Sequence, residues 1–161
     1  MHTPIYWVET GVAGRLGIMA RPRAGDWLAD EVQGLRDSGV DGLVSLLTPE
    51  EEAELGLQGE HQACENAGLR FLSLPIADRG VPPRDAATLG FLRQVRDEVR
   101  AGSSIAVHCR MGIGRSSLVA ASVLALLGVN PDEALQRLAT ARGLPVPDTE
   151  EQRQWVLHLP L

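Results

Sequence analysis

Residues 108–116, HCRMGIGRS, bring a thiol, two glycines and an arginine together directly after an apolar run. Successive backbone N–H groups in such a loop can all face inward, and the N-terminus of a following helix adds partial positive charge. Gly112 and Gly114 permit backbone angles and a close approach to a ligand that larger residues would resist. These residue types predict a loop that binds a tetrahedral oxyanion such as phosphate, formed by Cys109, Arg110, Met111, Gly112, Ile113, Gly114 and Arg115.

Several side chains of this phosphate-binding loop (residues 109–115) and its flanks can take part in chemistry. An electropositive loop lowers the pKa of the Cys109 thiol below the free value of about 8.5, and the thiolate is the nucleophilic form. Arg115 offers a planar fork that matches two phosphate oxygens. Ser116 can donate to the thiolate, and we expect His108 to order the loop by hydrogen bonding rather than to act as a base. The alternative is a buried structural cysteine beside an ordinary tight turn.

A second candidate segment is PIADRGVPP, residues 75–83, whose prolines and glycine predict a loop. Asp78 in this acid loop can protonate a leaving oxygen and then deprotonate the attacking water. Asp85 is the competing carboxyl group, which we expect in the first turn of the next helix. Arg79 can approach the anion or face water, and a solvated Asp78 is the alternative to a catalytic one.

The elements that must position these residues alternate along the chain. The apolar patterns predict strands at residues 5–8, 16–20, 42–47, 70–74 and 104–108. Helices are expected at 26–37, 58–67, 84–100 and 115–127, with capping signals for three more from Thr48, Asn130 and Thr149. The pattern is typical of an α/β fold with a central, mostly parallel sheet flanked by helices on both faces. Residues 109–115 then lie at the carboxyl end of a strand, where such folds bind ligands.

The helix at 26–37 carries four apolar residues spaced for one buried face, namely Trp27, Leu28, Val32 and Leu35.

Composition narrows the classes of function. The chain has 161 residues, 44% of them hydrophobic and 22% charged, which fits one ordinary globular domain. A formal net charge of −6 argues against a nucleic-acid partner, and no apolar run is long enough to span a membrane. With only Cys64 and Cys109, a reducing cytoplasmic location is the simplest expectation. The histidines show no metal-ligand spacing, so we expect no metal site and no cofactor.

HCRMGIGRS resembles the signature of the cysteine-based protein tyrosine and dual-specificity phosphatases, HC-x5-R followed by Ser or Thr. The resemblance extends to PIAD at residues 75–78, to the helices after the signature and to the final Thr-x-x-Gln, and covers about residues 40–155. It implies that Cys109 is the nucleophile, Arg115 the phosphate clamp, Ser116 the thiolate partner and Asp78 the acid. It also implies that Gln152 can position the attacking water, although a capping role explains this glutamine almost as well.

The expected function is that of a small dual-specificity-type phosphatase, with residues 1–161 as a single phosphatase domain. It would hydrolyse phosphotyrosine in a phosphorylated protein through a phosphocysteine intermediate, with phosphoserine and phosphothreonine as further candidates. One alternative substrate is a phosphoinositide or another small phosphomonoester, although the loop lacks the extra lysines of phosphoinositide enzymes. A non-hydrolytic phosphate-binding module and thiol redox chemistry are the remaining alternatives. Cys64 could form a disulfide with an oxidised Cys109, but a buried structural thiol is favoured.

Overall fold

In the computed structural model, which describes residues 2–161, a five-stranded sheet has the order β1-β2-β5-β3-β4. Only the edge strand β1 is antiparallel to its neighbour, and the other pairs are parallel. This arrangement confirms the mostly parallel sheet. The strands are β1 (Tyr6–Val8), β2 (Arg15–Met19), β3 (Gly42–Ser45), β4 (Arg70–Ser73) and β5 (Ser104–His108).

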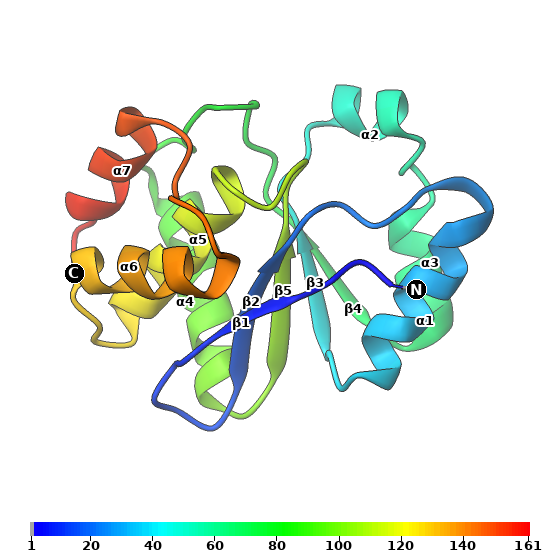
Figure 1. Cartoon of the computed structure of the whole chain (residues 1–161), viewed down its shortest axis with the longest axis horizontal. Helices are drawn as coiled ribbons and strands as arrows, with labels where there is room; N and C mark the ends of the chain where they lie inside the picture. The colour runs from blue at the N-terminus through cyan, green and yellow to red at the C-terminus, as the bar shows by residue number, and fades with distance from the viewer. Residues whose placement is uncertain (1) are drawn as a thin grey trace.

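Helices cover both faces of this sheet, as expected for the α/β class (Figure 1). In this view α4, α5, α6 and α7 lie on the left of the strands, α1 and α3 lie on the right, and α2 lies above β3. The helices are α1 (Leu28–Asp37), α2 (Pro49–Leu55), α3 (Glu60–Ala67), α4 (Ala86–Arg100), α5 (Arg115–Leu126), α6 (Pro131–Arg142) and α7 (Glu150–Leu157). None of the helices within residues 2–161 is long and apolar enough to cross a bilayer.

Helix α5 is the central element of the larger apolar core. It packs against α4, α6 and α7, and eleven of its twelve residues are buried. Small side chains such as Ala120 and Ala121 allow these close contacts, and each buried Leu or Val contributes about 1.5–3 kcal/mol. A helix fixed on so many sides gives the preceding loop a rigid base.

Three predicted helix starts have the capping interactions that the sequence indicates. The side chains of Thr48, Asn130 and Thr149 each accept a hydrogen bond from a backbone amide of their own helix, and Thr48 and Thr149 form complete capping boxes.

The expectation for Asp85 was wrong in one respect. It lies before the first turn of α4 as the N-cap, because its extended backbone lets its carboxylate accept from the Thr88 amide at 2.9 Å.

The prediction that Trp27 is buried was also wrong. Its side chain is 57% exposed, and the guanidinium carbon of Arg23 lies 4.5 Å from its ring centroid. The physical reason is local: residues Gly25–Trp27 form a 3₁₀ turn before α1, so Trp27 does not follow the α-helical spacing. Leu28, Val32 and Leu35 are buried as expected.

Candidate active site

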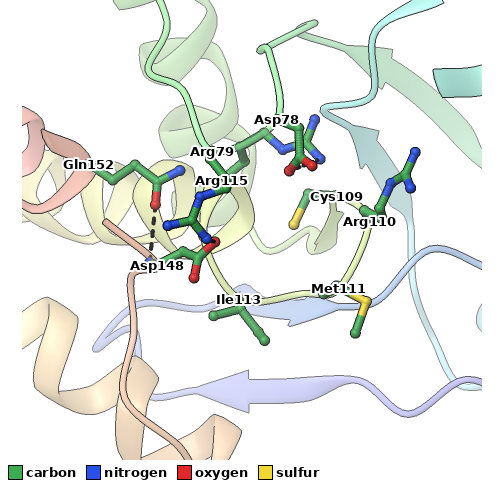
Figure 2. A pocket seen from close by; sticks show the side chains of 10 residues that line it. Asp78, Arg79, Cys109, Arg110, Met111, Ile113, Arg115, Asp148 and Gln152 are labelled. Atoms are coloured by element: carbon green, nitrogen blue, oxygen red, sulfur yellow. Dashed lines mark hydrogen bonds and ion pairs between the residues drawn. The ribbon is translucent and has the colours of Figure 1, made fainter. Parts of the chain in front are cut away.

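The phosphate-binding loop connects the end of β5 to the start of α5 and lies at the carboxyl end of the parallel strands. A cavity of about 270 Å³ opens above it, at the position expected for the ligand site of such a sheet. Figure 2 shows the side chains of Asp78, Arg110 and Ile113 on different sides of the Cys109 sulfur. The cavity is lined by Asp78, Arg79, Cys109, Arg110, Met111, Ile113, Gly114, Arg115, Asp148 and Gln152.

Both glycines of the loop occupy positions that a side chain would disrupt. Gly112 has φ +71°, and a Cβ on it would lie 2.6 Å from the backbone carbonyl carbon of Met19. A Cβ on Gly114 would lie 2.9 Å from the Gln152 Oε1. The backbone conformation requires glycine at Gly112, whereas Gly114 has an ordinary φ of −81° and leaves space for the Asp148 and Gln152 side chains.

Cys109 lies at the floor of the cavity and is only 3% exposed. Its Sγ is 3.4 Å from the Ser116 Oγ. Burial alone would raise the pKa of this thiol, but hydrogen bonds from the Ser116 hydroxyl and from the backbone amides of Ser116 and Ile113 outweigh burial. Together with the nearby Arg115 charge, they hold the pKa of Cys109 below its ordinary value. The thiolate is therefore favoured in the position that a nucleophile needs.

The buried Arg115 side chain is held by Glu51, a residue that the sequence analysis did not assign to the site. Arg115 Nη1 and Nη2 donate to the two Glu51 carboxylate oxygens at 2.6 and 2.9 Å. Arg115 Nη1 also donates to the Ile76 carbonyl at 2.8 Å. Burial opposes ionisation of Glu51, but hydrogen bonds from Arg115 and the Thr48 amide lower the pKa of this carboxyl from 4.5 to about 2. The pair fixes the plane of the guanidinium beneath the cavity.

Asp78 extends from the acid loop into the cavity, whereas Asp85 does not line it. The Asp78 Oδ1 accepts from Arg115 Nη2 at 3.1 Å while the carboxyl side chain remains 58% exposed. Asp85 instead accepts from the Thr88 amide, and these hydrogen bonds lower the pKa of its carboxyl. Of the two candidate acids, the structure brings only Asp78 to the loop.

Gln152 and Arg79 both line the cavity, and both connect the acid loop to the start of α7. The Gln152 Oε1 accepts from the Asp148 and Thr149 amides, each at 3.1 Å, and its Nε2 donates to the Gly80 carbonyl at 3.1 Å. The capping role that the sequence indicated for Gln152 is therefore present, and both ends of its amide have partners. Arg79, with φ +61°, donates to the Asp148 carboxylate at 2.8 Å.

His108 is fully buried beneath the loop and contacts it as expected for an ordering residue. Its Nδ1 lies 3.1 Å from the Cys109 carbonyl oxygen, and its Nε2 lies 2.5 Å from the Glu60 Oε2. Burial alone would lower the pKa of His108, but the Glu60 carboxylate on α3 outweighs burial and raises the pKa above 6.5. This buried carboxylate partner of His108 was not predicted from the sequence.

The second cysteine lies apart from the site. Cys64 belongs to α3 and to the smaller apolar cluster, whereas Cys109 belongs to the larger one across the sheet, and both thiols are free. Burial and the Glu60 charge raise the pKa of Cys64 to about 12, which keeps this thiol protonated. Within residues 2–161, no group of three or more His, Cys, Asp or Glu side chains could hold a metal ion.

Glu51 and Glu60 were missed because neither has a sequence signal of its own. Glu51 was visible only as the last residue of the capping box that Thr48 begins, a role that it also fills. Glu60 opens a short helix and lies 48 residues before its histidine partner. The available signal was their position, because each lies in the first turn of a helix that comes after β3, the strand that pairs with β5 and ends beside the loop.

Known protein families and relatives match most of the chain. The family model described as "Polymorphic toxin system, DSP-PTPase phosphatase" matches residues 17–129. "Putative tyrosine phosphatase 067L" of Invertebrate iridescent virus 3 is 33% identical over 135 residues, which cover 80% of this chain and 53% of the viral protein. The chain thus spans about half the length of this curated relative.

Two solved structures have a similar fold. Kinase associated phosphatase (KAP), determined with serine in place of its catalytic-site cysteine, has a TM-score of 0.86 at 21% identity and covers 100% of this chain and 99% of its own. Tk-PTP in its active form has a TM-score of 0.71 at 25% identity, covering 94% and 93%. The family match runs from within β2 to beyond α5 and so includes both the acid loop and the phosphate-binding loop. The chain therefore belongs to the family of DSP-PTPase phosphatases of polymorphic toxin systems.

Proposed function

We propose that this chain is a protein phosphatase of the dual-specificity type, which hydrolyses phosphotyrosine monoesters through a phosphocysteine intermediate. Phosphoserine and phosphothreonine are the further substrates of the proposal. The observation that carries it is the single cavity that gathers a thiol of lowered pKa, a buried arginine and an exposed carboxyl group, namely Cys109, Arg115 and Asp78. Loop amides and a guanidinium can bind the phosphoryl oxygens without a metal ion.

Substrate binding changes the partners of Arg115. A guanidinium has five N–H donors, of which the Glu51 carboxylate and the Ile76 carbonyl engage three. A fourth donates to the exposed Asp78 carboxylate. In the proposal a phosphoryl oxygen takes the place of Asp78 on Nη2, and the Asp78 carboxyl then moves to the bridging oxygen of the ester. Binding of the phosphoryl group is in this way coupled to the placement of the Asp78 carboxyl group.

The first chemical step transfers the phosphoryl group to sulfur. The Cys109 thiolate attacks phosphorus, the S–P bond forms as the bond from phosphorus to the tyrosine oxygen breaks, and the protonated Asp78 gives its proton to that oxygen. In the second step water attacks phosphorus and loses a proton to the Asp78 carboxylate. The S–P bond breaks, and inorganic phosphate leaves the regenerated thiolate, which accepts from the Ser116 hydroxyl.

The rim of the cavity favours a singly phosphorylated substrate over a polyanionic one. Met111, which is 56% exposed, gives the cavity an apolar wall that suits an aromatic ring. The rim cations Arg79 and Arg110 are each paired with a carboxylate, of Asp148 at 2.8 Å and of Glu54 at 3.2 Å. These pairs reduce the positive charge that a second phosphate would require, so the arrangement supports a phosphoprotein rather than a phosphoinositide.

We place the enzyme in the cytoplasm, because a cysteine nucleophile acts only while its thiol is reduced.

The test is turnover of an aryl phosphate and of a phosphotyrosine peptide in metal-free buffer with a chelator. Wild type should release phosphate from both, and Cys109→Ser should release none while it still binds inorganic phosphate. Cys64→Ala removes the other thiol and should retain activity, so it serves as the matched control. Turnover that requires a metal, or turnover by Cys109→Ser, would contradict the proposal. Phosphoserine and phosphothreonine peptides and phosphoinositide vesicles assayed in parallel decide between the substrate classes.

A further inference from the structure

Arg142, the last residue of α6, contacts the phosphate-binding loop from outside the cavity. Its Nε donates to the Gly112 carbonyl at 3.0 Å, and its Nη2 donates to the Met111 carbonyl at 3.3 Å. The guanidinium carbon also lies 4.5 Å from the ring centroid of Tyr6. An arginine at the end of a helix ordinarily interacts with the carbonyls of its own last turn, but these donors are directed to the loop.

Arg142 binds the carbonyls of the two peptide bonds on either side of Gly112. A change in the backbone angles of Gly112 would reorient both peptides. Both peptide units adjoin Gly112, the residue with φ +71° and no side chain to restrict its rotation. In a trans peptide the C=O and N–H groups point in opposite directions. A Gly112 carbonyl directed outward to Arg142 therefore directs the Ile113 N–H inward.

That inward amide reaches the nucleophile. The Ile113 N–H is one of the backbone donors to the Cys109 thiolate. One peptide bond thus connects the Arg142 guanidinium on its carbonyl side to the Cys109 sulfur on its amide side. A cation on the carbonyl polarises the peptide and strengthens the N–H as a donor.

A second arginine, Arg21, restrains the neighbouring Arg110–Met111 peptide through its carbonyl. The Arg110 carbonyl accepts from the Arg21 backbone amide at 3.3 Å and from the Arg21 Nη1 at 3.1 Å. Arg21 follows β2, so its hold on the loop is independent of α6. Because of this second restraint, a change at Arg142 should leave the fold in place and alter mainly the peptides beside Gly112.

We propose that Arg142 is a positioning residue for the phosphoryl-transfer site, which holds the Met111–Gly112 and Gly112–Ile113 peptides with their N–H groups toward the sulfur and the bound phosphoryl oxygens. The inference rests on the proposed function of the loop. It assigns a role to a residue of α6, which lies beyond the segment that matches the family model.

The experiment compares Arg142→Gln, Arg142→Lys and the matched control Arg137→Gln. Arg137 lies on the same helix and donates to the Glu9 carbonyl, away from the loop. The first measurement is the alkylation rate of Cys109 as a function of pH, followed on the peptide that contains it so that Cys64 does not interfere. Arg142→Gln should shift the alkylation profile to higher pH, Arg142→Lys should shift it less, and Arg137→Gln should leave it unchanged.

The second measurement is the affinity for inorganic phosphate in the Cys109→Ser background, together with kcat and KM of the variants that retain the thiol. Arg142→Gln should weaken phosphate binding about tenfold, because the peptides that Arg142 holds through the Met111 and Gly112 carbonyls would present their amides less well to the anion, a loss of about one charged hydrogen bond. An unshifted alkylation profile in Arg142→Gln would overturn the inference. If the glutamine variant fails to fold, an unshifted alkylation profile in Arg142→Lys would overturn it instead. If the Cys109→Ser parent binds no phosphate, the proposed function fails instead, and the alkylation profile still decides the role of Arg142.

Discussion

Glu51 and Arg115 form a two-pronged ion pair beneath the cavity, with Oε1–Nη1 and Oε2–Nη2 distances of 2.6 and 2.9 Å. Arg115 is 2% exposed, so a guanidinium is buried here with its counter-ion rather than extended into water. The two residues are 64 positions apart, and the pair joins the start of α2 to the start of α5. The guanidinium that we propose as the clamp for the phosphoryl group is therefore oriented before substrate arrives.

Replacing Glu51 by glutamine should impair both stability and catalysis. Glutamine can retain the capping box with Thr48, but its amide NH₂ would face a guanidinium that also donates. Leaving a buried charge without its partner costs about 3–5 kcal/mol. A misdirected Arg115 should lower kcat/KM by about 10²-fold. Denaturant unfolding and steady-state kinetics measure the two effects, and the exposed neighbour Glu50→Gln should change neither.

The same pair predicts how stability depends on pH. The pKa of Glu51 is about 2 in the folded chain, against an ordinary value of 4.5. A carboxyl with a lowered pKa stabilises the folded state above its unfolded pKa, and this contribution is lost as the pH falls through the folded pKa. The difference in unfolding free energy between wild type and Glu51→Gln should therefore be full above pH 4.5 and shrink toward pH 2. A difference that stays constant over this interval would show that the ion pair is not its source.

Local chemistry made much of the fold predictable. The Thr48, Asn130 and Thr149 caps each act within a few residues, and the apolar run before the loop is the central strand β5. Gly112 was also predictable, because a loop that turns its amides inward needs a positive φ at this position. In these places the sequence carries both partners of an interaction close together.

The parts that could not be predicted depend on contacts between distant segments. Glu60 and His108 are 48 positions apart, and Arg142 lies 30 positions from the carbonyl of Gly112. No local pattern distinguishes such residues from exposed charges on a helix. Trp27 shows the opposite error: its spacing suggested burial, but the turn before α1 carries it onto the surface.

Replacing Asp78 by asparagine should slow turnover of phosphotyrosine substrates by about 10²–10⁴-fold, because the leaving oxygen then departs without a proton. The loss should shrink for a fluorinated aryl phosphate, whose leaving group needs little protonation. The alkaline limb of the pH–rate profile should disappear, since it reports the loss of the proton from the acid. Initial rates across a series of aryl phosphates measure this dependence.

Asp85→Asn is the control for that series. Asparagine caps a helix about as well as aspartate, so α4 and the rate should both be retained. If Asp85→Asn shows the leaving-group dependence and Asp78→Asn does not, the general acid has been assigned to the wrong residue.

Alanine at Gly112 should weaken phosphate binding and turnover severely. The new Cβ would lie 2.6 Å from the Met19 backbone, at a φ of +71° that alanine rarely adopts, so the loop must move. We expect a loss of about 10²-fold in kcat/KM from the displaced amides. Gly90→Ala is the matched control, because nothing lies within 4 Å of a Cβ there and the residue is in α4. It should raise the unfolding free energy by about 0.5–1 kcal/mol and leave kcat/KM unchanged.

The most direct test of the account is to capture the phosphoryl group on sulfur. In Asp78→Asn, a fluorinated aryl phosphate should still phosphorylate Cys109, whereas hydrolysis slows because the carboxylate that accepts the proton of water is gone. Mass spectrometry of the peptide containing Cys109, after a denaturing quench during turnover, should show the added mass of one phosphoryl group, and the same peptide from Cys109→Ser should show none. A phosphoryl group on any other residue, or turnover with no phosphorylated peptide, would contradict the proposed phosphocysteine mechanism.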